Sequence, residues 1–136
     1  MSNFNRLFYH FVWATKDREP LINEKIEKTL FYCISEKVGG LNSICHQIGM
    51  TEDHIHLAVT VPPVISLASF VKNIKGNSTF LVNNSVSDQH FSWQGGYGVV
   101  SFNEKLLPII KKYIKNQKQH HKNDTLIEIL EKTERE

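Results

Sequence analysis

The sequence predicts one α+β domain with a ferredoxin-like βαββαβ order, a central antiparallel sheet and one additional C-terminal helix. Segments with period-two apolar alternation and segments with apolar residues three or four apart follow one another as strand, helix, strand, strand, helix, strand, helix. The link Thr51-Glu52-Asp53 is so short that the strands on either side of it must pair as an antiparallel hairpin. The 136 residues are one domain's worth, so residues 1–136 are expected to fold as a single domain.

The first half of the chain supplies three strands and one helix. Residues 5–15 are rich in aromatic and β-branched side chains on both faces, which favours a central strand. Apolar residues recur every four positions from Ile22 to Val38, and Asn23 is placed to cap this helix before Gly39-Gly40 ends it. Two strands, over residues 41–50 and 54–61, complete the hairpin.

The second half supplies the remaining helices and strand. Ser66 is expected to cap a helix running to about Asn83, with its inward side formed by Leu67, Phe70, Val71, Ile74 and either Phe80 or Leu81. The glycines from Gly95 to Gly98 precede a strand that ends at Phe102, and they suggest a bulge or a close backbone approach. A helix over about 104–121, capped by Asn103, and a short helix over about 124–132 are expected to follow.

The charge distribution is more informative than the net charge of +2. Six lysines and no acidic residue lie between Lys105 and Lys122, whereas residues 124–136 carry five acids against two bases. A basic helix is a candidate surface for nucleic acid, although such helices are often simply solvated. No apolar run approaches the ~20 residues that a membrane span requires, and the N-terminus lacks an apolar signal core, so a cytoplasmic protein with no membrane partner is expected.

The sequence His54-Ile55-His56 is the main candidate for a functional site. Successive side chains of a strand point to opposite faces, so the two histidines should project together while Ile55 points the other way. A pair of parallel imidazoles is suited to bind a divalent cation. Glu52 and Asp53 lie next to the histidines and could be metal ligands, but turn acids are usually solvated and these two are expected to be so. His10 is expected to be a hydrogen-bonded histidine in or near the sheet.

Tyr113 and Gln117 are four residues apart in the predicted helix 104–121, so they should occupy one helical face. A phenol can serve as a nucleophile and an amide oxygen as a metal ligand. His120 and His121 follow on the same helix, where histidines near a helix end are usually solvated, and neither is assigned to the site.

Taken together, these segments resemble the single-tyrosine HUH transposases of small bacterial insertion sequences, including the relatives associated with repeated extragenic palindromes (REP). The motifs that carry the resemblance are His54-Ile55-His56, Tyr113-x-x-x-Gln117, the opening Leu7–Lys16, Ile74-Lys75-Gly76 and Trp93–Gly98, and they cover nearly the whole chain in family order.

The resemblance implies a metal-assisted DNA transposase. Tyr113 would attack single-stranded DNA to form a 5′-phosphotyrosine with a free 3′-hydroxyl, while His54, His56 and Gln117 hold Mg²⁺ or Mn²⁺. It also implies recognition of DNA hairpins by a homodimer, in which the tyrosine helix of one subunit can complete the histidine pair of the other. The single strand would be held by lysines, namely Lys72, Lys75, Lys111, Lys112, Lys115 and Lys118.

Two other functions fit the same residues. One is a domesticated protein that binds hairpin DNA or processes repeats, and the other is a metal-dependent phosphoesterase in which water is the nucleophile. The sequence leaves open the DNA target, the metal, and whether Tyr113 acts on its own subunit's histidines.

Overall fold

A computed structural model describes residues 4–88, 90–123 and 125–133, and it contains the predicted antiparallel sheet. The strands are β1 (Phe8–Ala14), β2 (Ile44–Met50), β3 (His54–Thr60) and β4 (Gly98–Phe102). Their order across the sheet is β2-β3-β1-β4, and each neighbouring pair is antiparallel. The two central strands are therefore β3 and β1, and the predicted α+β, ferredoxin-like arrangement is confirmed.

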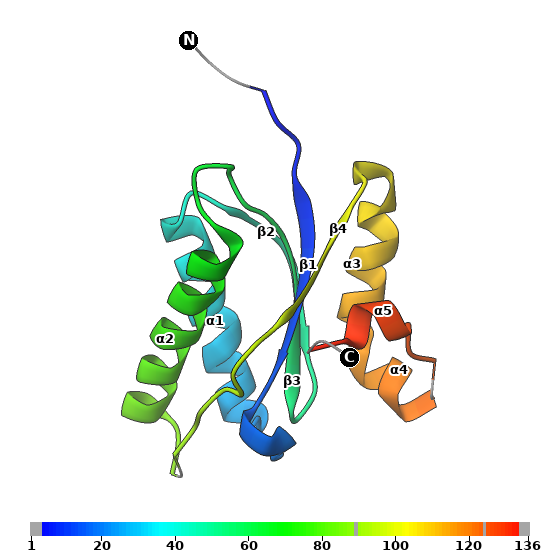
Figure 1. Ribbon diagram of the computed structural model, residues 1–136. Helices are drawn as coiled ribbons and strands as arrows, with labels where there is room; N and C mark the ends of the chain where they lie inside the picture. Colours follow the sequence, from blue (N-terminus) through cyan, green and yellow to red (C-terminus); the bar gives the residue numbers. More distant parts are fainter. Residues whose placement is uncertain (1–3, 89, 124, 134–136) are drawn as a thin grey trace.

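One face of the sheet is covered by α1 (Glu24–Gly40) and α2 (Leu67–Ser85), which pack side by side (Figure 1). As predicted, the side chains of Asn23 and Ser66 cap these helices by accepting backbone hydrogen bonds. The prediction that Phe80 or Leu81 faces inward is wrong, because these side chains are 64% and 37% exposed. The buried side of α2 continues instead through Val82, in step with the other inward residues of the helix.

The opposite face of the sheet carries α3 (Leu107–Lys115), α4 (Gln117–Asn123) and α5 (Glu128–Glu131) (Figure 1). The single helix predicted over about 104–121 is therefore divided: it starts as a 3₁₀ turn, η2 (Glu104–Leu106), and breaks at Asn116. Asparagine is a poor helix former, and Asn116 leaves the helical region with φ −99° and ψ 25°. The predicted final helix is shorter than expected, and Asp124, where it was to begin, lies outside the described residues.

At two glycines of the sheet, the backbone of another segment lies very close, on the face that carries α3, α4 and α5. A Cβ atom at Gly49 would lie 2.0 Å from the Ile114 carbonyl oxygen of α3. A Cβ atom at Gly98 would lie 1.7 Å from the Lys132 carbonyl oxygen, so the close backbone approach predicted for the glycine-rich segment is made by the C-terminal segment. Hence α3 and the residues after α5 lie directly against the sheet. In the described part of the chain, no helix combines the length and apolarity needed to cross a bilayer.

Candidate metal centre and tyrosine nucleophile

His54 and His56 project from β3 toward α3, α4 and α5, where they contact Tyr113, His121 and Glu131, while Ile55 lies in the apolar core. As the sequence predicts, the pleat of the strand directs the two histidines to one face of the sheet and Ile55 to the other. The centroids of the two imidazole rings are 5.0 Å apart. Their side chains are almost fully buried, with 2% of His54 and none of His56 exposed. The pair is thus fixed in the centre of the sheet.

His54 is oriented by the turn that precedes it. Its Nδ1 lies 2.7 Å from Asp53 Oδ1 and 2.8 Å from Thr51 Oγ1. A carboxylate beside Nδ1 favours a proton on that nitrogen, which leaves the lone pair on Nε2. Asp53 is therefore more than the solvated turn acid predicted from the sequence, because it positions the ring of a candidate ligand.

His56 is oriented by His10 of the neighbouring strand, whose Nε2 lies 2.9 Å from His56 Nδ1. The sequence predicted a hydrogen-bonded histidine in the sheet, and this contact confirms it. Burial and the neighbouring His56 lower the pKa of His10 to about 3, so His10 is neutral at physiological pH. The contact turns His56 Nε2 toward the same space as His54 Nε2.

Tyr113 of α3 and Gln117 of α4 reach this space within the same chain. The Tyr113 ring is 6.1 Å from the His56 ring, and only 4% of Tyr113 and 1% of Gln117 are exposed. Gln117 Oε1 lies 3.0 Å from Nε2 of His121. Tyr113 and Gln117 therefore lie on the same side, as predicted, although the helix breaks between them. The tyrosine lies beside the histidine pair of its own subunit.

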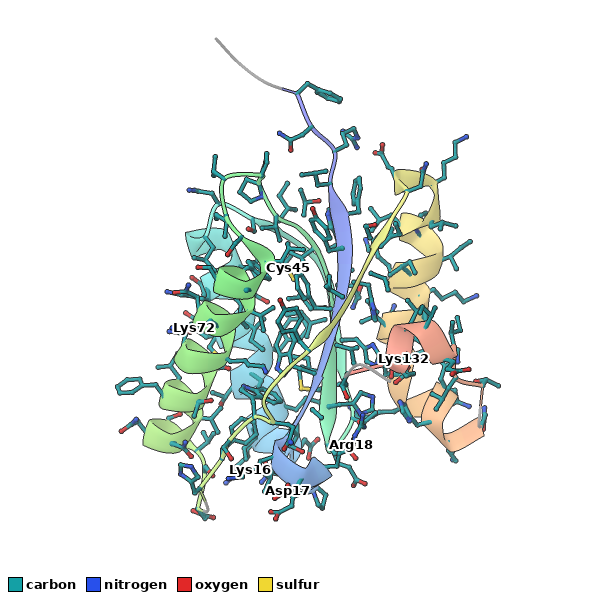
Figure 2. The ribbon with its side chains drawn as sticks, viewed as in Figure 1. Lys16, Asp17, Arg18, Cys45, Lys72 and Lys132 are labelled. Carbon is teal, nitrogen blue, oxygen red and sulfur yellow. The ribbon has the colours of Figure 1, made fainter. Side chains whose placement is uncertain are left out.

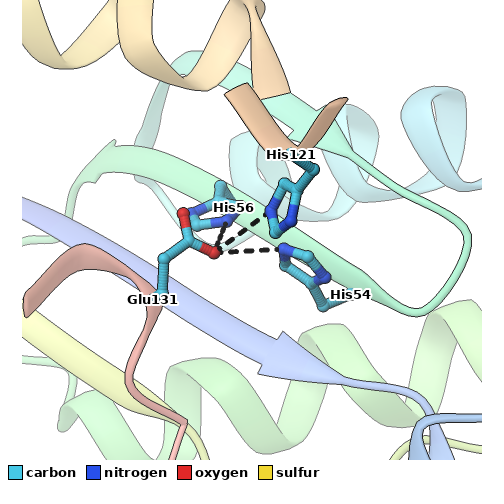
Figure 3. A group of neighbouring side chains, drawn as sticks. All are labelled: His54, His56, His121 and Glu131. Atoms are coloured by element: carbon cyan, nitrogen blue, oxygen red, sulfur yellow. Dashed lines mark hydrogen bonds and ion pairs between the residues drawn. The ribbon is translucent and has the colours of Figure 1, made fainter. Parts of the chain in front are cut away.

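Two residues that the sequence did not assign to the site, His121 and Glu131, complete the cluster (Figure 3). Glu131 Oε1 is 3.2 Å from Nε2 of His54, 3.2 Å from Nε2 of His56 and 3.4 Å from Nε2 of His121. The other carboxylate oxygen accepts a hydrogen bond from the Tyr113 hydroxyl. The expectation that His121 is solvated is wrong, because α4 turns it over the histidine pair. No local pattern in the sequence indicates that residue 131 packs against residue 54.

The cluster keeps a carboxylate and a neutral phenol side by side. Burial acts to raise the pKa of Glu131, but the contacts of its carboxylate with the imidazoles of His54 and His56 outweigh burial and hold this pKa well below its usual range. Burial, followed by the hydrogen bond to Glu131, raises the pKa of Tyr113 to about 12. In this arrangement Glu131 is ionised and Tyr113 is protonated.

The six predicted DNA-binding lysines do not form one surface. Lys72 is exposed on α2, on the far side of the sheet from α3 (Figure 2). Lys75 donates to the backbone oxygens of Gln94 and Gly96 at 2.9 and 2.6 Å, and Lys118 pairs with Glu27 at 2.6 Å. Three exposed lysines remain on α3: Lys111, Lys112 and Lys115.

The sheet order, the buried histidine pair and the adjacent tyrosine agree with the family resemblance seen in the sequence, and comparison with known proteins identifies the family. The family model described as "Transposase IS200 like" matches residues 3–117. The chain therefore belongs to the IS200-like transposases, a family of enzymes that cut and rejoin DNA.

Individual relatives support this family. The chain is 26% identical over 120 residues to the transposase of insertion sequence IS200 from Salmonella typhimurium, covering 84% of this chain and 78% of the relative. It is 25% identical to the ISDra2 transposase TnpA of Deinococcus radiodurans, over 82% of this chain and 84% of the relative.

Two solved structures share the fold. One is described as a transposase from D. radiodurans R1, with a TM-score of 0.67, 22% identity, and coverage of 86% of this chain and 95% of that one. The other is a REP-associated tyrosine transposase bound to a REP hairpin, with a TM-score of 0.67, 17% identity, and coverage of 89% and 74%.

Proposed function

We propose that this protein cleaves and rejoins single-stranded DNA through a covalent 5′-phosphotyrosine at Tyr113, assisted by a divalent cation. The observation that supports this proposal most directly is that the Tyr113 hydroxyl and the Nε2 atoms of His54 and His56 contact the same carboxylate, that of Glu131. A phosphate group in place of that carboxylate would meet the nucleophile and the cation ligands together. As a transposase, the protein would act on DNA in the cytoplasm.

The residues present fit a divalent cation. His54 Nε2 is buried, and its contact with Glu131 Oε1, at 3.2 Å, lacks the geometry of a hydrogen bond. A buried nitrogen without a hydrogen bond is costly, and a bound cation would remove this cost. With DNA bound, His54, His56 and Gln117 would hold Mg²⁺ or Mn²⁺, which would polarise the phosphodiester and offset charge on its non-bridging oxygens.

The protein's own part in the reaction is carried by Tyr113. Its hydroxyl oxygen forms a bond to phosphorus as the bond from phosphorus to the 3′-oxygen breaks, and on balance the phenolic proton ends on the departing 3′-oxygen, which leaves as a hydroxyl. The phosphotyrosine retains the cut strand, so a 3′-hydroxyl can attack it and restore the phosphodiester. Because the pKa of Tyr113 is raised to about 12 with Glu131 in place, the phenol needs a changed environment before it reacts.

The DNA contacts are proposed from the surface of the molecule. The solved neighbour bound to a REP hairpin supports a hairpin as the ligand. The exposed lysines of α3 would contact the phosphate backbone. Lys72 and Lys75 line a groove of about 750 Å³ between α2 and residues 92–97, where Trp93 and Tyr97 offer surfaces for stacking. Lys118 and Lys75 would have to exchange their present protein contacts for phosphate.

A homodimer remains part of the proposal, as the family resemblance implies. The geometry does not require a shared site, because Tyr113 already lies beside the histidines of its own chain. Mixing Tyr113→Phe with His56→Ala protein tests this point. Recovered cleavage would show sites shared between subunits, whereas no recovery in a protein that still forms dimers would show sites built within each subunit.

The proposed reaction is tested by incubating the protein and Mn²⁺ with labelled single-stranded hairpins whose flanks are randomised. We expect a denaturation-resistant protein–DNA adduct that is absent in Tyr113→Phe and retained in Tyr32→Phe, a matched change at a tyrosine that is 69% exposed. Released product without an adduct would instead support the phosphoesterase, and binding without cleavage would support a domesticated binding protein.

A further inference from the structure

The distances around Glu131 Oε1 match those between ligands of one metal ion. Donor atoms about 2.1 Å from an ion lie roughly 3.0 to 3.5 Å from one another in octahedral or tetrahedral geometry. Glu131 Oε1 is 3.2, 3.2 and 3.4 Å from the three histidine nitrogens. All four donor atoms of this group lie within 4.8 Å of one another. The cluster is thus compact enough to surround a single cation.

The orientation of the rings agrees with this geometry. His54 and His56 each place Nδ1 against a positioning group, which leaves Nε2 directed toward Glu131 (Figure 3). The ring of His121 lies 4.6 Å from that of His54 at an angle of 63°, and it too presents Nε2 to Glu131. Three imidazole nitrogens therefore converge on one carboxylate oxygen.

A cation also has a route to the cluster. His121 is 30% exposed and lines a groove of about 620 Å³ together with four acidic residues, Glu24, Glu27, Glu52 and Asp53. The only base in the described lining of this groove besides histidine is Lys118, which is already paired with Glu27. Such a groove attracts a divalent cation.

We propose that, in the DNA-free protein, His121 and Glu131 are ligands of the same cation as His54 and His56, forming a centre of three imidazoles and one carboxylate. This inference rests on the proposed function for its two strand ligands and adds two that neither the sequence nor the family assignment supplies. Imidazole-rich centres favour transition-metal dications over Mg²⁺, which prefers oxygen ligands and retains water. The free protein should accordingly bind Mn²⁺ or Co²⁺ more tightly than Mg²⁺.

Glu131 is the ligand that DNA must replace. His54 and His56 are fixed on a central strand, whereas Glu131 lies on a four-residue helix near the end of the described chain. The same segment covers the nucleophile, because the Ile127 amide donates to the Tyr113 hydroxyl at 3.0 Å and that hydroxyl donates to Glu131. When a phosphate oxygen takes the place of Glu131, the cation acquires its substrate and Tyr113 loses its carboxylate partner together.

The inference is tested on full-length protein stripped of metal, without DNA. Mn²⁺ is titrated by electron paramagnetic resonance, and Co²⁺ binding is followed by its visible absorption bands, which report the number and type of ligands. We expect Glu131→Gln and His121→Ala each to weaken Mn²⁺ binding at least tenfold and to change the Co²⁺ bands. Glu128→Gln, at an exposed carboxylate on the same helix, is the matched control and should bind as the unaltered protein does.

Other outcomes separate this inference from the proposed function. If Mn²⁺ affinity and Co²⁺ bands are unchanged in Glu131→Gln and His121→Ala but are lost in His54→Ala, the two additional ligands are refuted and the histidine pair stands. If Gln117→Ala alone weakens binding, the third ligand of the DNA-free site is Gln117 and the inference is overturned. Metal binding as expected, without any Tyr113 adduct on DNA, would refute the proposed function and leave the metal centre intact.

Discussion

Leu130 offers a way to open the site without altering any residue that takes part in chemistry. Its side chain is 5% exposed and packs with Ala58, Ile110, Tyr113 and Ile114, so it fastens α5 over the cluster. Leu130→Ala removes three buried carbons at about 0.8 kcal/mol each, or about 2 kcal/mol. If α5 must leave before DNA enters, this change shifts the balance toward the open state about 30-fold.

The assay measures the initial rate of Tyr113–DNA adduct formation at saturating Mn²⁺, with the same pool of labelled hairpins. We expect the rate to rise about 30-fold in Leu130→Ala. Ile129→Ala is the matched control: it removes an adjacent side chain that is 58% exposed and should change the rate less than twofold. Hydrogen exchange of residues 126–132 reports independently whether the segment has come away.

One result would refute the reasoning. If residues 126–132 lose their protection from exchange in Leu130→Ala and the adduct forms no faster, DNA does not reach Tyr113 by displacing this segment. Should the protection persist in that variant, a chain ending at Thr125 removes the segment outright and must show at least this acceleration.

Three further predictions test the scaffold around the site. His10→Phe leaves His56 Nδ1 without its partner and should weaken Mn²⁺ binding about 10- to 100-fold, and a titration that shows no change would contradict the positioning role. Gly49→Ala places a Cβ atom 2.0 Å from a carbonyl of α3 and should lower the free energy of unfolding in urea by about 2 kcal/mol or more, whereas Gly39→Ala, with nothing within 4 Å, should not. Burial raises the pKa of Cys33 to about 11, so its alkylation should be slow at pH 8 and accelerate toward pH 11, and the free energy of unfolding should fall over the same rise in pH because only the unfolded state readily forms the thiolate. Alkylation of Cys33 at the rate of an unfolded control at pH 8 would show that the thiol is not buried.

The sequence predicts the fold well because its signals are local. Strand alternation, caps at Asn23 and Ser66, and the short link before His54 each fix an element or a pairing within a few residues. The prediction that Phe80 or Leu81 faces inward is wrong because α2 has apolar residues on more than one side, and the sequence does not indicate which side packs against the sheet.

The candidate site is predicted only in part, for a corresponding reason. The common face of His54 and His56 follows from the period of a strand, and the nearness of Tyr113 and Gln117 from the period of a helix. The positions of His121 and Glu131 depend on the helix break at Asn116 and on the path of the chain from α4 to α5. Neither the strand period nor the helix period predicts these two features. The predicted close approach at Gly98 was the one indication that a segment crosses β4, and it does not identify which segment.

The two faces of the sheet differ in a way that supports a bound ion. The face under α1 and α2 is an apolar core, whereas the other face buries His10, His54, His56 and Gln117 to 2% exposure or less. Burying polar groups lowers stability unless each finds a partner, and the contact of His54 Nε2 with Glu131 lacks hydrogen-bond geometry. A chain selected for stability alone would gain by placing apolar side chains at these positions. The burial of three histidines in the central strands, with Gln117 and Tyr113 on the helices that cover them, is accounted for if a cation binds there and a phosphate is exchanged for Glu131.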